Sequence, residues 1–187
     1  SGSVRIDGID VREWDKRTLR RHLGLVLQDV FLFSGDIARN ISLGDPAISE
    51  AQMAEAVRRV HAQGFIDRLP DGLRAVVEER GSTLSQGERQ LLSFARALAF
   101  DRPILIMDEA TSSVDTATEL LIQDALRALL LGRTALIIAH RLSTIQFVDR
   151  IIVLHKGRIR EEGTHQELLA YGGLYSRLYE LQYQPLA

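Results

Sequence analysis

The sequence of 187 residues contains no cysteine. This absence excludes disulfide bonds and metal sites built from thiolates. Lysine is also rare, because Lys16 and Lys156 are the two lysines among 23 basic side chains, and neither follows a glycine. The chain therefore lacks a glycine-rich loop ending in Gly-Lys-Ser or Gly-Lys-Thr, with which many proteins hold the phosphates of a nucleotide.

Long apolar runs and a surplus of one charge are missing as well. No stretch reaches the ~18 uninterrupted apolar residues of a membrane span, so we expect none within these residues. The net charge is −2 and the arginines are spread along the chain, whereas a nucleic-acid binder concentrates basic charge on one face. We therefore expect no nucleic-acid partner. Apolar residues make up 45% of the chain, which suffices for the core of one domain.

Short apolar segments alternate with helical patterns along the chain. Strands are predicted at 4–8, 23–27, 104–107, 134–139 and 150–154, the last opening a hairpin. Helix starts are predicted at Asp15, at the capping boxes Ser49/Gln52, Ser85/Glu88 and Thr164/Glu167, and at Asp115 for a helix over about 116–131. Strands that alternate with helices predict an α/β fold with a parallel sheet, and the strand-free pattern over about 36–100 predicts an inserted helical subdomain.

The segment "PILIMDEATSSVD" (103–115) places two carboxylates at the end of a predicted strand. Asp108 has the hard oxygen ligands that Mg²⁺ prefers, and Glu109 could orient or deprotonate a water. If only the three residues "MDE" (107–109) are considered, an acidic pair that caps the next turn is an equally good interpretation. Gln28 and His140 follow two further buried strands, so all four side chains would meet at one edge of the sheet, where open α/β sheets bind ligands.

Five segments in this order resemble the nucleotide-binding domain of ABC transporters of the exporter type, over essentially the whole chain. "LVLQD" resembles the Q-loop, "TLSQGERQLLSFARAL" the signature motif and its helix, "ILIMDEAT" the Walker B strand, "SSVD" the D-loop, and "IIAHRLST" the switch-histidine loop. The resemblance implies a P-loop NTPase-like, three-layer ABC ATPase fold. Its α/β core would comprise 1–33 and 101–187, and its helical subdomain 34–100.

The resemblance also implies ligands and roles. The cofactors would be ATP and Mg²⁺, with the metal held by Asp108 and Gln28. Glu109 would be the general base, with His140 and Gln28 as further catalytic residues that contact the γ-phosphate, the metal or the water. Nucleotide bound to a second such domain would be contacted by the residues of the signature motif and the D-loop, namely Ser85, Gln86, Gly87, Glu88 and Asp115.

The same resemblance implies partners and a location. The partners would be a second nucleotide-binding domain, identical or not, and the coupling helices of a transmembrane domain. Contact with the membrane would run only through that domain, on the cytoplasmic face of the inner membrane. ATP binding and hydrolysis would then drive export through nucleotide-dependent dimerisation.

Two departures from the family pattern bear on these expectations. The signature usually reads LSGGQ, whereas here Gln86 replaces a glycine and Glu88 replaces the glutamine. The strands and the Walker A loop that open such domains are not in this sequence, so we expect a part of a longer exporter chain, inactive alone. The competing hypothesis is a non-catalytic, partner-binding or regulatory piece. A chromosome-maintenance ATPase is disfavoured because residues 36–82 lack the heptads of a long coiled coil.

Overall fold

The computed structural model describes residues 2–78, 81–108, 115–139 and 144–183. The chain divides into two compact units, Ser1–Ile138 and Ala139–Ala187, and each unit has its own hydrophobic core. The strands of the first unit are β1 Arg5–Ile6, β2 Ile9–Asp10, β3 Leu23–Val26, β4 Gly35–Asp36, β5 Val76–Val77, β6 Ile104–Asp108 and β7 Thr134–Ile138. Its helices are α1 Lys16–His22, α2 Ile37–Ser42, α3 Glu50–Arg59, α4 Gln63–Ile66, a 3₁₀ turn at Gly72–Arg74, α5 Gln86–Phe100 and α6 Thr116–Leu130.

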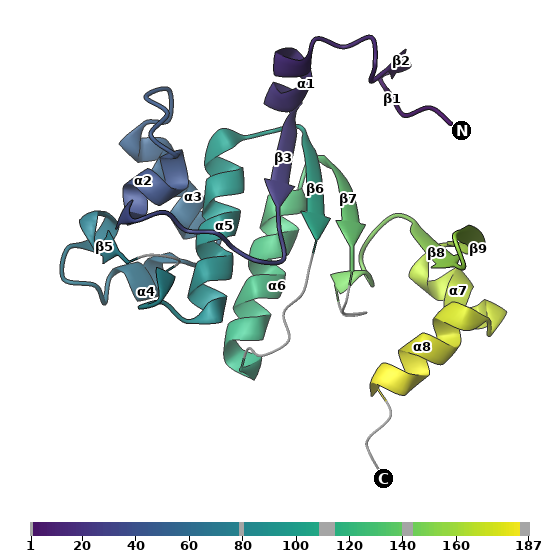
Figure 1. The fold of residues 1–187 in the computed structure, drawn as a ribbon. Coiled ribbons are helices and arrows are strands. Elements are labelled where there is room, and N and C mark those ends of the chain that lie inside the picture. The colour runs from purple at the N-terminus through teal and green to yellow at the C-terminus, as the bar shows by residue number, and fades with distance from the viewer. Residues whose placement is uncertain (1, 79–80, 109–114, 140–143, 184–187) are drawn as a thin grey trace. The chain divides into compact units, whose positions relative to one another are not determined.

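A parallel sheet with the strand order β3-β6-β7 organises the first unit (Figure 1). In the registers of the two ladders, Val26 lies opposite Met107, and Asp108 lies opposite Ile138. The carboxyl ends of the three strands therefore meet at one edge. The strands predicted at 23–27, 104–107 and 134–139 and their parallel arrangement are confirmed.

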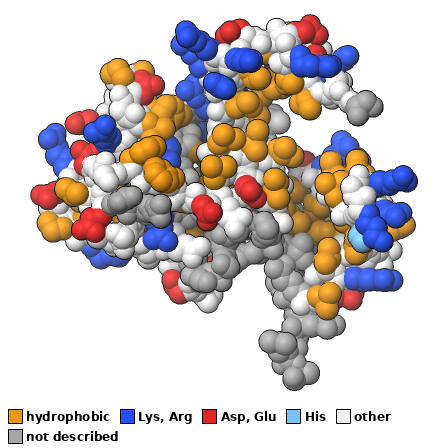
Figure 2. Space-filling model, in the orientation of Figure 1, with side chains coloured by type: hydrophobic (Ala, Val, Ile, Leu, Met, Phe, Trp, Pro, Cys, Tyr) orange, Lys and Arg blue, Asp and Glu red, His pale blue; other side chains and the backbone are white. Residues whose placement is uncertain are grey.

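One face of this sheet is buried and the other is exposed among the described residues. Val26, Leu105 and Met107 belong to the core that also contains the apolar faces of α5 and α6. On the opposite face, Leu25 and Leu136 are each 61% exposed, and both lie beside Ile106 in the ladder registers. Figure 2 shows hydrophobic side chains gathered over these strands. A parallel sheet is normally covered on both faces, so this apolar surface is unusual.

The helices begin where the sequence predicts, because side-chain caps satisfy their first N–H groups. Asp15 accepts a hydrogen bond from the N–H of Thr18 at the start of α1. Both partners of the capping boxes Ser49/Gln52 and Ser85/Glu88 make their hydrogen bonds. Helix α6 ends at Leu130, one residue before the predicted end, within the usual scatter of helix boundaries.

One detail of the first unit differs from the sequence-based prediction. The segment 36–100 is not free of strands, since Gly35–Asp36 pairs with Val76–Val77 in a two-residue antiparallel ladder. The segment 4–8, expected to be a short strand that ends in a turn, forms β1 and the turn of a hairpin with β2. Its turn residues Asp7 and Gly8 have φ of 50° and 80°, the left-handed conformation that a two-residue hairpin loop requires.

The second unit consists of a hairpin and two helices, β8 Ile151–His155, β9 Arg158–Gly163, α7 His165–Tyr171 and α8 Leu174–Tyr183. The predicted hairpin is confirmed, with Lys156 and Gly157 in its turn at φ of 50° and 71°. The predicted capping box of Thr164 and Glu167 opens α7. Helices that could cross a bilayer, by length and apolar character, are not found among the described residues of the chain.

Candidate functional site

The carboxyl edge of the β3-β6-β7 sheet carries the described part of the predicted site. Asp108 is the last residue of β6 and is half-buried. Gln28 follows the end of β3 by two residues and its side chain is exposed. Since Val26 lies opposite Met107, Gln28 and Asp108 emerge at the same edge. Their amide and carboxylate oxygens are hard ligands of the kind that Mg²⁺ takes.

Two of the predicted catalytic residues, Glu109 and His140, lie outside the described residues. Asp108, which directly precedes Glu109 in the sequence, is paired with Ile138 across β6 and β7. Groups of three or more His, Cys, Asp or Glu side chains that could hold a metal ion are not found in the described part of the chain. That finding is compatible with Mg²⁺, which commonly uses one or two protein oxygens together with water and phosphate oxygens.

The second part of the site is the beginning of helix α5. The exposed Ser85 is its N-cap, and its hydroxyl accepts a hydrogen bond from the N–H of Glu88 at 3.2 Å. The N–H groups of Gln86 and Gly87 stand in the first turn, where a helix offers no intrahelical acceptor. Free N–H groups at the positive end of the helix dipole can bind an anion. The capping interpretation and the anion-binding interpretation of Ser85 are therefore compatible.

The carboxylate of Glu88 is turned back onto the cap. Its Oε2 accepts the N–H of Ser85 at 2.9 Å, and its Oε1 lies 3.2 Å from a guanidinium nitrogen of Arg68. The anion that replaces the glutamine of the usual signature is thus held beside a cation and directed at its own backbone. Its charge is thereby offset by Arg68 and by the N–H of Ser85, which limits its repulsion of a phosphate near the helix end.

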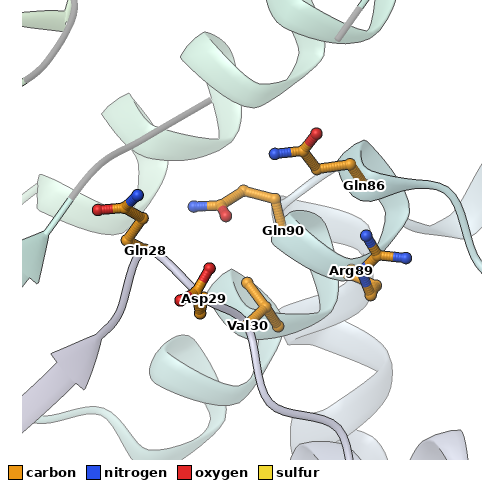
Figure 3. Close-up of a pocket in the computed structure, with 6 residues that line it drawn as sticks. All are labelled: Gln28, Asp29, Val30, Gln86, Arg89 and Gln90. Carbon is orange, nitrogen blue, oxygen red and sulfur yellow. The ribbon is translucent and has the colours of Figure 1, made fainter. Parts of the chain in front are cut away.

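A cavity of about 290 Å³ separates the Gln28 segment from helix α5. Residues 28–30 line one side, and the α5 residues Gln86, Arg89 and Gln90 line the other. Figure 3 shows the side chain of Gln90 extending toward Gln28 across the cavity. Gln90 is 5% exposed, which is uncommon for an amide side chain. The structure thus brings Gln28 and Gln86, which were predicted separately, to one cavity.

Asp115 serves as the N-cap of α6 in this structure. Hydrogen bonds from the hydroxyl and the N–H of Thr118 to this exposed carboxylate lower the pKa of Asp115 below its ordinary value. The side chain is therefore a stable anion that fixes the start of α6. The predicted role of Asp115 at a dimer interface is a different one, because it would involve contact with a second subunit.

Sequence reasoning missed several polar residues that hold this region together. Gln90 lines the cavity, Arg89 on α5 binds the backbone carbonyl of Leu84 in the preceding loop, and Arg96 binds that of Asn40 in helix α2. Asn40 on α2 is 1% exposed and binds the backbone of Phe33. One signal was available, namely that Arg96 interrupts the otherwise apolar stretch "SFARALAF" (93–100).

Comparisons with known proteins agree with this geometry. The sequence profile of the family described as ABC transporter matches residues 1–112. The probable multidrug resistance ABC transporter ATP-binding/permease protein YheH of Bacillus subtilis (strain 168) is 53% identical over 181 residues, which are 97% of this chain and 27% of that protein. An ATP-dependent lipid A-core flippase of Chromobacterium violaceum is 49% identical over 183 residues, 98% of this chain and 31% of the flippase.

A solved structure agrees in fold. The structure of a bacterial Atm1-family ABC exporter with ATP bound superimposes with a TM-score of 0.90 at 42% sequence identity, and the match covers 100% of this chain and 33% of the exporter chain. The chain thus spans between a quarter and a third of the length of these relatives. Since the family profile matches more than half of its residues, the chain belongs to the ABC transporter family.

Proposed function

We propose that these residues are part of the ATP-binding and ATP-hydrolysing module of an ABC exporter, and that nucleotide-driven dimerisation of this module powers export. The observation that carries the proposal is the shared carboxyl edge of β3, β6 and β7, where Gln28 and Asp108 emerge together. Such an edge is where open α/β sheets bind ligands. The start of α5 adds an anion-binding helix end to the same unit.

The proposed chemistry is positioning together with neutralisation of charge, as is usual for phosphoryl transfer. Asp108 would hold Mg²⁺, with the amide oxygen of Gln28 as a further oxygen donor to the metal and to the attacking water. When bound, Mg²⁺ offsets the charge that develops on the phosphate oxygens. Glu109 orients and deprotonates the water, and His140 donates to the γ-phosphate; these two roles rest on the family resemblance.

The signature helix and the D-loop serve the second subunit in this proposal. Ser85 and the N–H groups of Gln86 and Gly87 contact the γ-phosphate of ATP on the partner, and Asp115 organises the interface. Support comes from the exposure of Ser85 and from the hydrogen bond and ion pair that hold the Glu88 carboxylate on the N–H of Ser85 and beside Arg68. Residues 34–100 form the helical subdomain. The module lies on the cytoplasmic face of the inner membrane, and the parent protein contacts that membrane only through its transmembrane domain.

The proposal is tested with Glu109→Gln in the full-length parent protein. The amide keeps the shape of the side chain but is not a base, so we expect the ATPase rate to fall by ~10²-fold or more while ATP binding remains. Glu180→Gln, an exposed change on α8, is the control and should leave the rate unchanged. Near-normal turnover in Glu109→Gln would remove Glu109 from the role, and absence of turnover in the unaltered parent would favour the non-catalytic alternative.

The action of Ser85 on the partner's nucleotide is tested by mixing subunits. A subunit carrying Ser85→Arg is combined with a subunit disabled at its own phosphate loop, so that one of the two composite sites stays complete. We expect this heterodimer to close with ATP, as measured by cross-linking between subunits. If it closes no better than dimers in which both subunits carry both changes, Ser85 does not act across the interface.

A further inference from the structure

Arg96 is a charged residue in the apolar part of helix α5 and is only partly exposed. Its Nε donates to the carbonyl oxygen of Asn40 at 2.8 Å, and its Nη2 donates to the carbonyl oxygen of Phe31 at 3.2 Å. One guanidinium therefore joins α5 to helix α2 and to the segment that follows Gln28. These partners lie 56 and 65 residues away in the sequence, so the contact is a tertiary clamp.

The side chain of Asn40 completes this clamp. Its Oδ1 accepts the N–H of Phe33 at 2.8 Å, and its Nδ2 donates to the carbonyl oxygens of Phe33 at 2.8 Å and Asp36 at 3.1 Å. One buried amide thus satisfies both backbone polar groups of Phe33. The segment 31–33 is held at Phe31 by Arg96 and at Phe33 by Asn40, although it has no regular secondary structure of its own.

A second arginine fixes another loop to the same helix. Arg89 precedes Arg96 by seven residues, which is about two helical turns, so both lie on one side of α5. The Nη1 of Arg89 donates to the carbonyl oxygen of Leu84 at 2.6 Å, directly before Ser85. The loop that contains Gly81 and Leu84 also lies close to the segment 31–33. A Cβ placed on Gly81 would be 2.7 Å from a methyl carbon of the buried Leu32.

The segment 31–33 presents two aromatic rings outward. Phe31 and Phe33 are 53% and 50% exposed and pack edge to face with centroids 4.9 Å apart. By contrast, Gln28 and Asp29 are exposed residues at the rim of the cavity. The clamp therefore begins at Phe31, three residues after the Gln28 that emerges from the sheet.

We propose that Arg96 is a positioning residue: by fixing residues 31–33 to helix α5, it holds the segment that follows Gln28 at a set distance from the Ser85 end of that helix. This inference rests on the proposed function of Gln28 and Ser85. Loss of the clamp would then change the distance between the two halves of the site. No covalent step is involved.

The chemistry of Arg96 favours positioning over stabilisation. Burial lowers the pKa of its guanidinium, because a less polar environment disfavours the charged form. Among the described residues, the ion pairs of the chain do not include Arg96, so its partners are neutral carbonyls. A partly buried charge without a countercharge is a poor source of stability compared with an apolar side chain of the same volume. The planar fork, however, fixes the direction of two hydrogen bonds at once.

The clamp itself is tested by hydrogen exchange in the full-length parent with Arg96→Met. We expect amides in peptides covering 30–34 to exchange about tenfold faster, as for a segment that gains local freedom. The control is Arg133→Met, because Arg133 also donates to a carbonyl, that of Leu129 at 2.6 Å, and its side chain is 7% exposed; unlike Arg96, it also pairs with Asp101. The control should raise exchange near 129–134 and leave 30–34 unchanged. Unchanged protection of 30–34 in Arg96→Met would overturn the clamp.

The positioning role is tested by kinetics on the same variants. Because ATP would contact other residues, we expect Arg96→Met to leave KM for ATP within about twofold and to lower kcat by about fivefold or more. Arg133→Met should keep kcat. Lost protection with unchanged kcat would overturn positioning. If Arg96→Met does not fold, Arg96→Lys, which keeps the charge but not the planar fork, carries both measurements. An inactive parent would refute the proposed function, while the exchange data would still decide the clamp.

Discussion

At the scale of single residues, Glu88 is the clearest departure from the usual signature, and its carboxylate binds the N–H of Ser85 and lies beside Arg68. We expect Glu88→Gln to keep the hydrogen bond through its amide oxygen and to lose only the charge near the helix end, about 0.3–1 kcal/mol of stability. Glu88→Ala should cost more because the N–H loses its acceptor. Thermal unfolding measures both, and equal losses would contradict this account of the cap.

Gly81 offers a second test at this scale, because its φ is 66° and the buried Leu32 approaches it closely. Alanine at such a φ costs roughly 1–2 kcal/mol. The control is Gly132→Ala, since Gly132 has a φ of 73° and no atom within 4 Å of a placed Cβ. We expect Gly81→Ala to cost about 1–3 kcal/mol beyond the control, the range for overpacking a core. Equal urea-unfolding free energies of the two variants would show that Leu32 simply moves aside.

Among individual residues, the sequence allowed prediction of those whose neighbours in the chain explain them. Asp108 and Gln28 follow apolar strands, and Ser85 and Glu88 are spaced as a capping box, so local patterns suffice. Arg96 and Asn40 escaped prediction because their partners are backbone groups distant in the sequence. Because every residue has a backbone carbonyl, the sequence does not indicate which residue accepts the hydrogen bond.

At the scale of elements, the three capping boxes allow a test with an internal control. Hydrogen bonds from the N–H and the hydroxyl of Thr164 lower the pKa of Glu167 below its ordinary value of 4.5. A depressed folded pKa contributes stability that is present above the ordinary value and is lost as pH falls through the folded value. The box of Ser49 and Gln52 has the same geometry with an uncharged side chain.

We therefore compare Glu167→Ala and Gln52→Ala with the unaltered chain between pH 7 and pH 3, using hydrogen-exchange protection factors of α7 and α3. Loss of protection in α7 caused by Glu167→Ala should shrink as pH falls below about 4.5, because the unaltered chain loses its own cap there. Loss in α3 caused by Gln52→Ala should stay constant. A pH-independent difference at Glu167 would show that the carboxylate charge contributes nothing to the cap.

Elements with long, regular patterns were predicted well, and short pairings were not. The strands of the parallel sheet and the starts of α1, α3, α5, α6 and α7 follow from apolar runs and caps. The ladder of Gly35–Asp36 with Val76–Val77 has two residues per strand, too few to show a period of two. The register of this ladder depends on how two loops about 40 residues apart pack together, and tertiary contacts determine that packing.

At the scale of the whole molecule, the apolar sheet face formed by Leu25, Ile106 and Leu136 bears on what residues 1–187 can do alone. Two of these side chains are 61% exposed, and each leucine buried instead would contribute about 1.5–3 kcal/mol. A face of this kind is a site of association with other apolar surface. We therefore expect residues 1–187, prepared alone, to associate more readily than the full-length parent.

The final prediction is that residues 1–187 alone bind Mg-ATP more weakly than the micromolar range. The phosphate donors proposed on this chain, Gln28, His140 and the start of α5, act on a γ-phosphate or face a partner subunit. This sequence contains no Gly-Lys-Ser or Gly-Lys-Thr loop that could bind the α- and β-phosphates and neutralise their charge. Without those N–H groups and the lysine, the phosphates of a nucleotide would not be fixed beside the Mg²⁺ that Asp108 is proposed to hold.

Isothermal titration calorimetry of residues 1–187 with Mg-ATP measures this affinity, and the full-length parent is the positive control. We expect no saturation below about 1 mM nucleotide, which corresponds to less than about 4 kcal/mol of binding free energy. Asp108→Asn should then change nothing measurable in the isolated residues, although it should weaken Mg-ATP binding in the parent. A micromolar dissociation constant that Asp108→Asn abolishes would mean that the carboxyl edge of the sheet holds the phosphates by itself, and that the missing loop is not needed for nucleotide binding.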